Sequence, residues 1–102
     1  MGERFYSTLG LCMRAGRLAF GFDTVREAVR AGKVSLLMTA SDLSEKTSKE
    51  VVFLADKYQI PYLALDRTQS QLRSTIGKLT GVLAVTDDGL ARSLQQAAAS
   101  AD

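Results

Sequence analysis

Two spacings of hydrophobic residues alternate along the chain. In some segments apolar residues recur every three or four positions, as on one face of an α-helix. Between these segments lie short, continuous apolar runs, which are typical of strands covered on both faces. The pattern predicts helices at about 4–14, 23–31, 45–58, 68–76 and 90–97, and strands at 17–20, 34–40, 62–65 and 82–86. This order predicts an α/β protein, a three-layer α/β/α sandwich with a small, mostly parallel mixed sheet.

Residues at the segment boundaries support these assignments. Asp23 is expected to cap the second helix, because its carboxylate accepts hydrogen bonds from free amides of a first turn. Gly32 follows the last apolar residue of that helix, as a helix stop does. Either Asp42 or Ser44 is expected to cap the third helix. Pro61 ends this helix region and suits the first residue of a strand.

Composition indicates one globular domain, residues 1–102. The chain is 46% hydrophobic and 24% charged, which is ordinary for a soluble protein with a core. No apolar run approaches the ~20 residues that span a bilayer. The first ten residues, MGERFYSTLG, lack the apolar stretch of a signal peptide. We therefore expect a cytoplasmic protein without a membrane association.

Catalytic and cofactor-binding patterns are missing from the sequence. The chain has no histidine, and its one cysteine, Cys12, lies in an apolar helical pattern and is expected in the core. Neither GxGxxG after a strand nor GxxxxGK[ST] occurs. Asp87 and Asp88 precede a helix, where a turn and cap are favoured over a magnesium site. We expect no enzyme activity, no cofactor and no metal.

Charge is concentrated in two segments. Residues 1–33 contain six basic and three acidic side chains, and residues 67–81 contain three basic side chains and no acid. The net charge of the whole chain is only +2. Two basic segments on a nearly neutral chain predict a local surface for a polyanion.

The stretch from Gly21 to Arg26 is the strongest candidate for such a surface. A helix start offers unpaired amide donors to phosphates, and Asp23 and Thr24 can read base edges. Arg17 lies upstream and Lys33 at the other end of the same helix, and we include both with Arg26 as candidate contacts. A capped helix with a solvated basic face is the alternative interpretation of the same residues.

Several stretches resemble the L7Ae/L30e family of ribosomal proteins. The segment GFDTVREAVRAGKVSLLMTASD is similar to the family pattern G-[TS]-N-E-x-[TV]-K-x-[VI]-x-x-G, followed by a strand that ends in A-x-D. Further along, IPY, L-x-x-x-x-G and VLAVTDDG resemble its later strand and helix boundaries. The resemblance extends over nearly the whole chain and is strongest to the short bacterial YlxQ-like branch.

The resemblance implies a non-enzymatic domain that binds kink-turn RNA, as a monomer and in association with the ribosome or another ribonucleoprotein. Matched by position, contacts to the sheared G·A pairs fall on Gly21, Phe22, Asp23, Thr24 and Glu27. The loop before the last strand, with Lys78, Leu79 and Thr80, takes the flipped-out bases. We expect both groups, and both basic segments, to meet at one end of the sandwich.

Three positions depart from the family pattern. Its asparagine is Asp23 here, its glutamate is Thr24 and its lysine is Glu27. An aspartate accepts hydrogen bonds but does not donate them, and it repels phosphate. The sequence therefore predicts RNA binding with a weaker or altered specificity. The alternative is a protein-interaction module that keeps the fold and has lost RNA binding.

Overall fold

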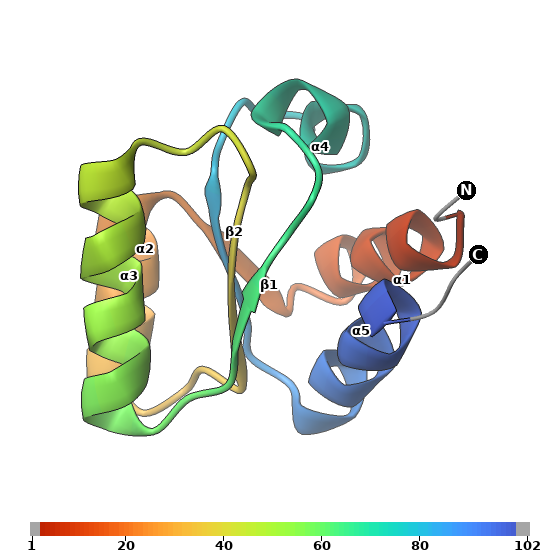
Figure 1. Ribbon diagram of the computed structural model, residues 1–102. Helices are drawn as coiled ribbons and strands as arrows, with labels where there is room; N and C mark the ends of the chain where they lie inside the picture. The colour runs from red at the N-terminus through yellow and green to blue at the C-terminus, as the bar shows by residue number, and fades with distance from the viewer. Residues whose placement is uncertain (1–2, 100–102) are drawn as a thin grey trace.

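Each helix and strand that the hydrophobic pattern predicts is present in the computed structural model, which describes residues 3–99 (Figure 1). The bounds differ from those expected by a few residues at most. The helices are α1 (Glu3–Arg14), α2 (Phe22–Arg30), α3 (Glu45–Tyr58), α4 (Gln69–Ile76) and α5 (Asp88–Ala99). The strands are β1 (Leu18–Phe20), β2 (Leu36–Thr39), β3 (Tyr62–Ala64) and β4 (Val82–Val85).

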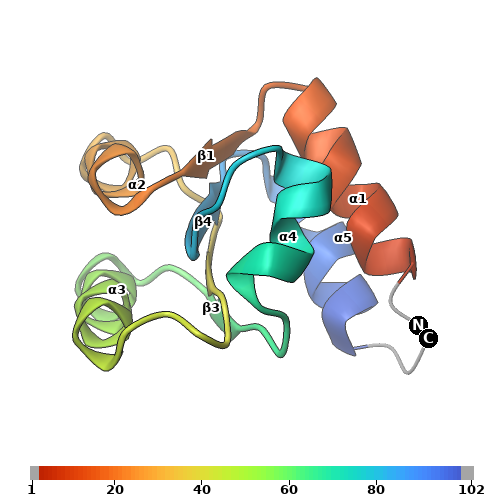
Figure 2. The same ribbon diagram turned by 90° about the horizontal axis from the view of Figure 1, so that it is seen from above.

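The sheet lies between two layers of helices, which confirms the predicted three-layer sandwich. From above, α2 and α3 cover one face, and α1, α4 and α5 cover the other (Figure 2). Leu36 and Met38 pack toward the second group, whereas Leu37, the residue between them, packs toward α2 and α3. Because every residue of β2 and β4 is buried on one face or the other, the strands are continuous apolar runs in the sequence.

The strand directions correct one expectation. The order in the sheet is β1-β4-β2-β3. In the described sheet β2 and β3 are parallel, but β4 is antiparallel to both of its neighbours, β1 and β2. The sheet is therefore mixed but mostly antiparallel, and the predicted mostly parallel sheet is wrong.

Helix α4 explains this difference. A crossover helix returns the chain to the opposite end of the sheet, so that the next strand runs parallel to the last. With 8 residues, α4 is about 12 Å long, and it lies across the end of the sheet at the top of Figure 1. The chain enters β4 at the end where β3 stops. A buried strand has the same apolar pattern in either direction, so the sequence pattern did not reveal this.

This topology gathers four chain segments at one end of the sheet, which we call the upper edge. Here β1, β2 and β3 end and β4 begins. The amide of Gly21 donates to the carbonyl of Val82 (3.0 Å), and the amide of Ala40 donates to the carbonyl of Gly81 (2.9 Å). The opposite end, where β1 and β2 begin and β4 ends, is called the lower edge.

Candidate nucleic-acid interface

Gly21 joins β1 to α2 at the upper edge. Its backbone has φ 89° and ψ 140°, which L side chains rarely adopt, and the space beside it is open. Its carbonyl accepts from the amide of Val25 (2.9 Å), so the first intrahelical bond of α2 begins at the residue that is held to β4. Gly21 thereby turns the chain from strand to helix within one residue and fixes where the helix starts.

The start of α2 lacks the side-chain cap that the sequence predicted. Gly21, not Asp23, is the N-cap, and no side chain of the described residues caps this helix. In contrast, Ser44 caps α3, Thr68 caps α4 in a reciprocal capping box, and Asp87 accepts from the first turn of α5. Because first-turn amides have no intrahelical partners, α2 retains donors and a partial positive charge for an external anion.

The charged side chains of α2 pair along the helix. Asp23 lies 3.4 Å from Arg26, and Glu27 lies 3.7 Å from Arg30. Asp23, Glu27 and Arg30 are solvent-exposed and Arg26 is half-buried, so both pairs contribute little to stability. They do, however, place an arginine beside Asp23 and another beside Glu27, the two carboxylates at positions that depart from the family pattern. The half-buried Arg26 also lies over the ring of Phe22, 5.4 Å from its centroid.

The loop between α4 and β4 lies next to this helix start. Lys78 is exposed and Leu79 is 58% exposed, whereas Thr80 is half-buried and its hydroxyl donates to the carbonyl of Val82 (3.4 Å). That same carbonyl accepts from Gly21, so the loop and the start of α2 meet at the first residue of β4. The structure thus brings together Gly21, where α2 starts, and Thr80, the last residue of the predicted loop site.

Two further loops lie at the upper edge, residues 40–44 after β2 and 65–68 after β3, and the sequence analysis did not assign them to the site. Of the two predicted caps of α3, Ser44 is the one observed. The carboxylate of Asp42 instead accepts a hydrogen bond from the amide of Gln69 (2.9 Å) at the start of α4. A Cβ added to Gly81 would lie 2.8 Å from Leu43 and 3.2 Å from Gln69. The A-x-D motif after β2 was the signal that pointed here.

Arg17 and Lys33 are not at the upper edge. Arg17 directly precedes β1 and Lys33 follows α2, so both lie at the lower edge, beside Asp87 and Asp88, around a hollow of about 870 Å³. The 9 residues of α2 span about 13 Å, which separates Lys33 from Gly21. The expected convergence of both basic segments is therefore not found: the first segment is divided between the two edges.

A groove of about 340 Å³ runs between α2 and α3. Phe22 and Arg26 line it from α2, and Lys49 and Phe53 line it from α3. Phe53 is 64% exposed, although it is a large aromatic residue. The groove shares Phe22 with the start of α2, so an apolar surface continues from the upper edge along this side of the molecule.

Potential catalytic chemistry is sparse in the described part of the chain. Residues 3–99 hold no group of three His, Cys, Asp or Glu side chains that could bind a metal ion. Cys12 is buried, as predicted, and burial, together with the nearby charge of Asp87, raises the pKa of its thiol. None of the described helices is long and apolar enough to cross a bilayer.

The protein is thus a small α/β/α sandwich. At its upper edge the start of α2, which has no side-chain cap, meets a loop bounded by two glycines. The chain belongs to the ribosomal protein L7Ae/L30e/S12e/Gadd45 family, whose model matches residues 3–95.

Two curated relatives and one solved structure illustrate the similarity. The chain is 33% identical to "RNA-binding protein YlxQ" of Bacillus subtilis (strain 168), over 91% of this chain and 93% of that protein. It is 29% identical to large ribosomal subunit protein eL30 of Aeropyrum pernix, over 83% of this chain and 87% of that protein. A solved structure described as a protein with unknown function from Bacillus halodurans C superposes with a TM-score of 0.88 at 34% identity, covering 95% of this chain and 98% of that chain.

Proposed function

We propose that this chain binds structured RNA at the upper edge and works in association with the ribosome or another ribonucleoprotein. The observation that carries the proposal is the meeting of the uncapped start of α2 with the loop Lys78–Thr80. Family membership supports it, because the relatives named above are an RNA-binding protein and a ribosomal protein. The finer part of the proposal is that the RNA contains a kink-turn.

Each part of the site has a distinct role in this proposal. The first-turn amides of α2 donate to a backbone phosphate, and the side chains of Asp23 and Thr24 contact base edges of the G·A pairs. The exposed Leu79 packs against an unstacked base, as apolar and aromatic groups do in RNA recognition. Lys78 neutralises a phosphate. The role is binding without chemistry, consistent with a chain that has no histidine.

Affinity is expected to be moderate and dependent on salt. The side chains Asp23, Arg26, Glu27 and Arg30 sum to zero charge, so α2 contributes little long-range attraction. Neutralising ~4 phosphates would give a slope of log K against log salt of about −3 to −4, if the scaling for B-DNA carries over.

The test is a calorimetric titration of two RNA duplexes. One is a standard kink-turn, and the other has its G·A pairs replaced by Watson–Crick pairs. Tight binding to the first duplex alone supports kink-turn recognition. Equal affinity for both supports structured-RNA binding but contradicts the kink-turn, and no binding to either contradicts the proposed function. Sedimentation of the free protein in the same buffer tests the expected monomer.

A protein-binding module is the second candidate, favoured by one observation. Leu79 and Phe53 are more than half exposed, and the groove between α2 and α3 extends the apolar surface from Phe22. Exposed apolar surface of this kind often marks a protein contact. RNA that copurifies from a lysate and is released above a few hundred millimolar salt would argue against this candidate, since counterions displace only the phosphate contacts.

A further inference from the structure

Arg67 connects the upper edge to α1 through an unusually enclosed side chain. It lies in the loop between β3 and α4, and its side chain is only 16% exposed. Its guanidinium stacks over the ring of Phe5, 4.1 Å from the centroid, and lies 5.3 Å from that of Tyr6. Asp66 binds its Nη1 at 3.1 Å but is itself 92% exposed. The aromatic rings of α1, rather than the exposed ion pair, therefore hold this side chain in place.

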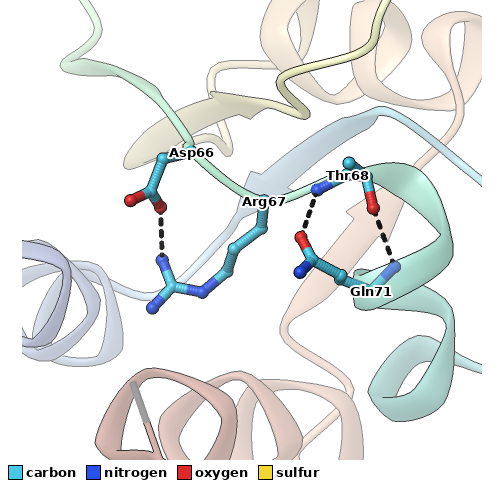
Figure 3. A network of polar contacts seen from close by, with 4 residues as sticks. All are labelled: Asp66, Arg67, Thr68 and Gln71. Carbon is cyan, nitrogen blue, oxygen red and sulfur yellow. Dashed lines mark hydrogen bonds and ion pairs between the residues drawn. The ribbon is translucent and has the colours of Figure 1, made fainter. Parts of the chain in front are cut away.

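The main chain around Arg67 holds the neighbouring loop. Its carbonyl accepts from the amide of Ser41 (2.8 Å), just beyond the end of β2. Directly after it, Thr68 and Gln71 form the reciprocal capping box of α4, with bonds of 2.8 and 3.2 Å. Figure 3 shows the Arg67 side chain extending away from this capping pair, with Asp66 beside its guanidinium. The start of α4 is thus fixed on one side by its own cap and on the other by the Arg67 stack.

A second set of contacts runs from the start of α4 to the loop Lys78–Thr80. The amide of Gln69 donates to Asp42, and the side chain of Gln69 packs against the backbone of Gly81 together with Leu43. Gly81 directly follows Thr80. At the other end of the loop, Gly77 is the C-cap of α4 and donates to the carbonyl of Arg73 (2.7 Å). Both ends of the loop are therefore anchored on α4 or on residues packed against it.

We propose that Arg67 is a positioning residue for the RNA-binding loop. Its stack on Phe5 and Tyr6 fixes the start of α4, and α4 in turn fixes Lys78, Leu79 and Thr80 relative to the start of α2. Lysine would not replace it, because a flexible ammonium lacks the planar face that stacks on a ring. The expected effect on RNA affinity rests on the proposed RNA binding. The positioning of the loop is a property of the free protein.

The experiment compares Arg67→Met, Arg67→Lys and the control Arg92→Met by amide NMR of the free protein and by titration with the kink-turn duplex. Arg92 is an exposed arginine of α5 that lines a hollow at the lower edge, so Arg92→Met removes the same charge without touching the network. We expect both Arg67 variants to shift and broaden the amide signals of Leu79 and Gly81 and to lower RNA affinity at least about fivefold. Arg92→Met should leave the loop signals in place and change the affinity less than about twofold.

Two results would overturn the proposal. Loop signals that stay at their wild-type positions in both Arg67 variants would show that Arg67 supports only its own surroundings. A loss of affinity without any change in the loop would indicate instead that Arg67 contacts the RNA directly. If wild type binds no RNA, the proposed function fails, yet the NMR comparison still decides whether Arg67 positions the loop. Arg67→Lys retains the charge and most of the stem, so the test stands if Arg67→Met does not fold.

Discussion

Replacing Gly21 by alanine tests whether the start of α2 is the working surface. At φ 89° and ψ 140° the backbone is close to a region that only glycine occupies readily. A Cβ at this position would meet no described atom within 4 Å, so the cost is conformational strain rather than a clash. Strain of this kind costs about 1–3 kcal/mol. We expect the upper half of this range, and a fall in Tm of about 4 °C or more for each kcal/mol.

Relief of this strain would move the start of α2 away from Val82. A hydrogen bond from an amide to a charged phosphate contributes about 1.5–3 kcal/mol, so losing one would weaken RNA binding about 10- to 100-fold. The assay is calorimetric titration of Gly21→Ala with the kink-turn duplex, at a temperature where circular dichroism shows the variant folded.

Gly32→Ala is the matched control. Gly32 lies beyond the other end of α2, also has a positive φ (72°), and also has open space beside it. Its substitution should also lower Tm, because a left-handed backbone costs about 1–2 kcal/mol with a side chain, but leave RNA affinity within about twofold, because the start of the helix is untouched. An equal loss of affinity in the two variants would refute the reasoning, since general destabilisation would then account for both.

Three further predictions concern other parts of the molecule. Lys78→Ala should lower RNA affinity and reduce the salt slope by about 1, with Tm unchanged, and titrations at several salt concentrations measure this. Arg17→Ala combined with Lys33→Ala should change kink-turn affinity less than about twofold, because both residues lie at the lower edge; a loss beyond about tenfold would place RNA there as well. The raised pKa of the Cys12 thiol means that the contribution of this thiol to stability is constant below its ordinary pKa of about 8.5 and falls as pH rises toward the folded-state value. Urea unfolding at about pH 7 and about pH 10 should show that fall, and Cys12→Ser should remove the part due to this thiol.

The helices, the strands and the layers could all be predicted from the sequence. The reason is that burial gives helices and strands different spacings of apolar residues. Val25 and Val29 mark the inner face of α2, and the run around Leu37 marks a strand covered on both sides. The direction of β4 was not accessible, since a fully buried strand carries no sign of its polarity. It depended on α4, which lies across the upper edge and leaves the chain there, so that β4 runs antiparallel to β2.

The candidate site was predictable in part. The glycine positions and the family likeness in the sequence pointed to the start of α2 and the loop at Lys78, which the structure places at one edge. The cap was assigned to Asp23 because aspartate is a good acceptor, but Gly21 occupies the N-cap, and Asp23 lies inside the first turn of the helix. The contact between Gln69 and Asp42 was missed because it joins residues 27 positions apart.

By itself the sequence determined the kinds of elements, the core residues and the family to which the chain belongs. These follow from local period and from matched motifs, which need no knowledge of neighbours in space. Only the tertiary structure decided which edge each residue occupies: it separated Lys33 from Gly21 by the length of α2 and brought Arg67 onto Phe5. The physical reason is that a contact between distant segments depends on the direction in which each connection returns, and strand direction leaves no trace in a buried run.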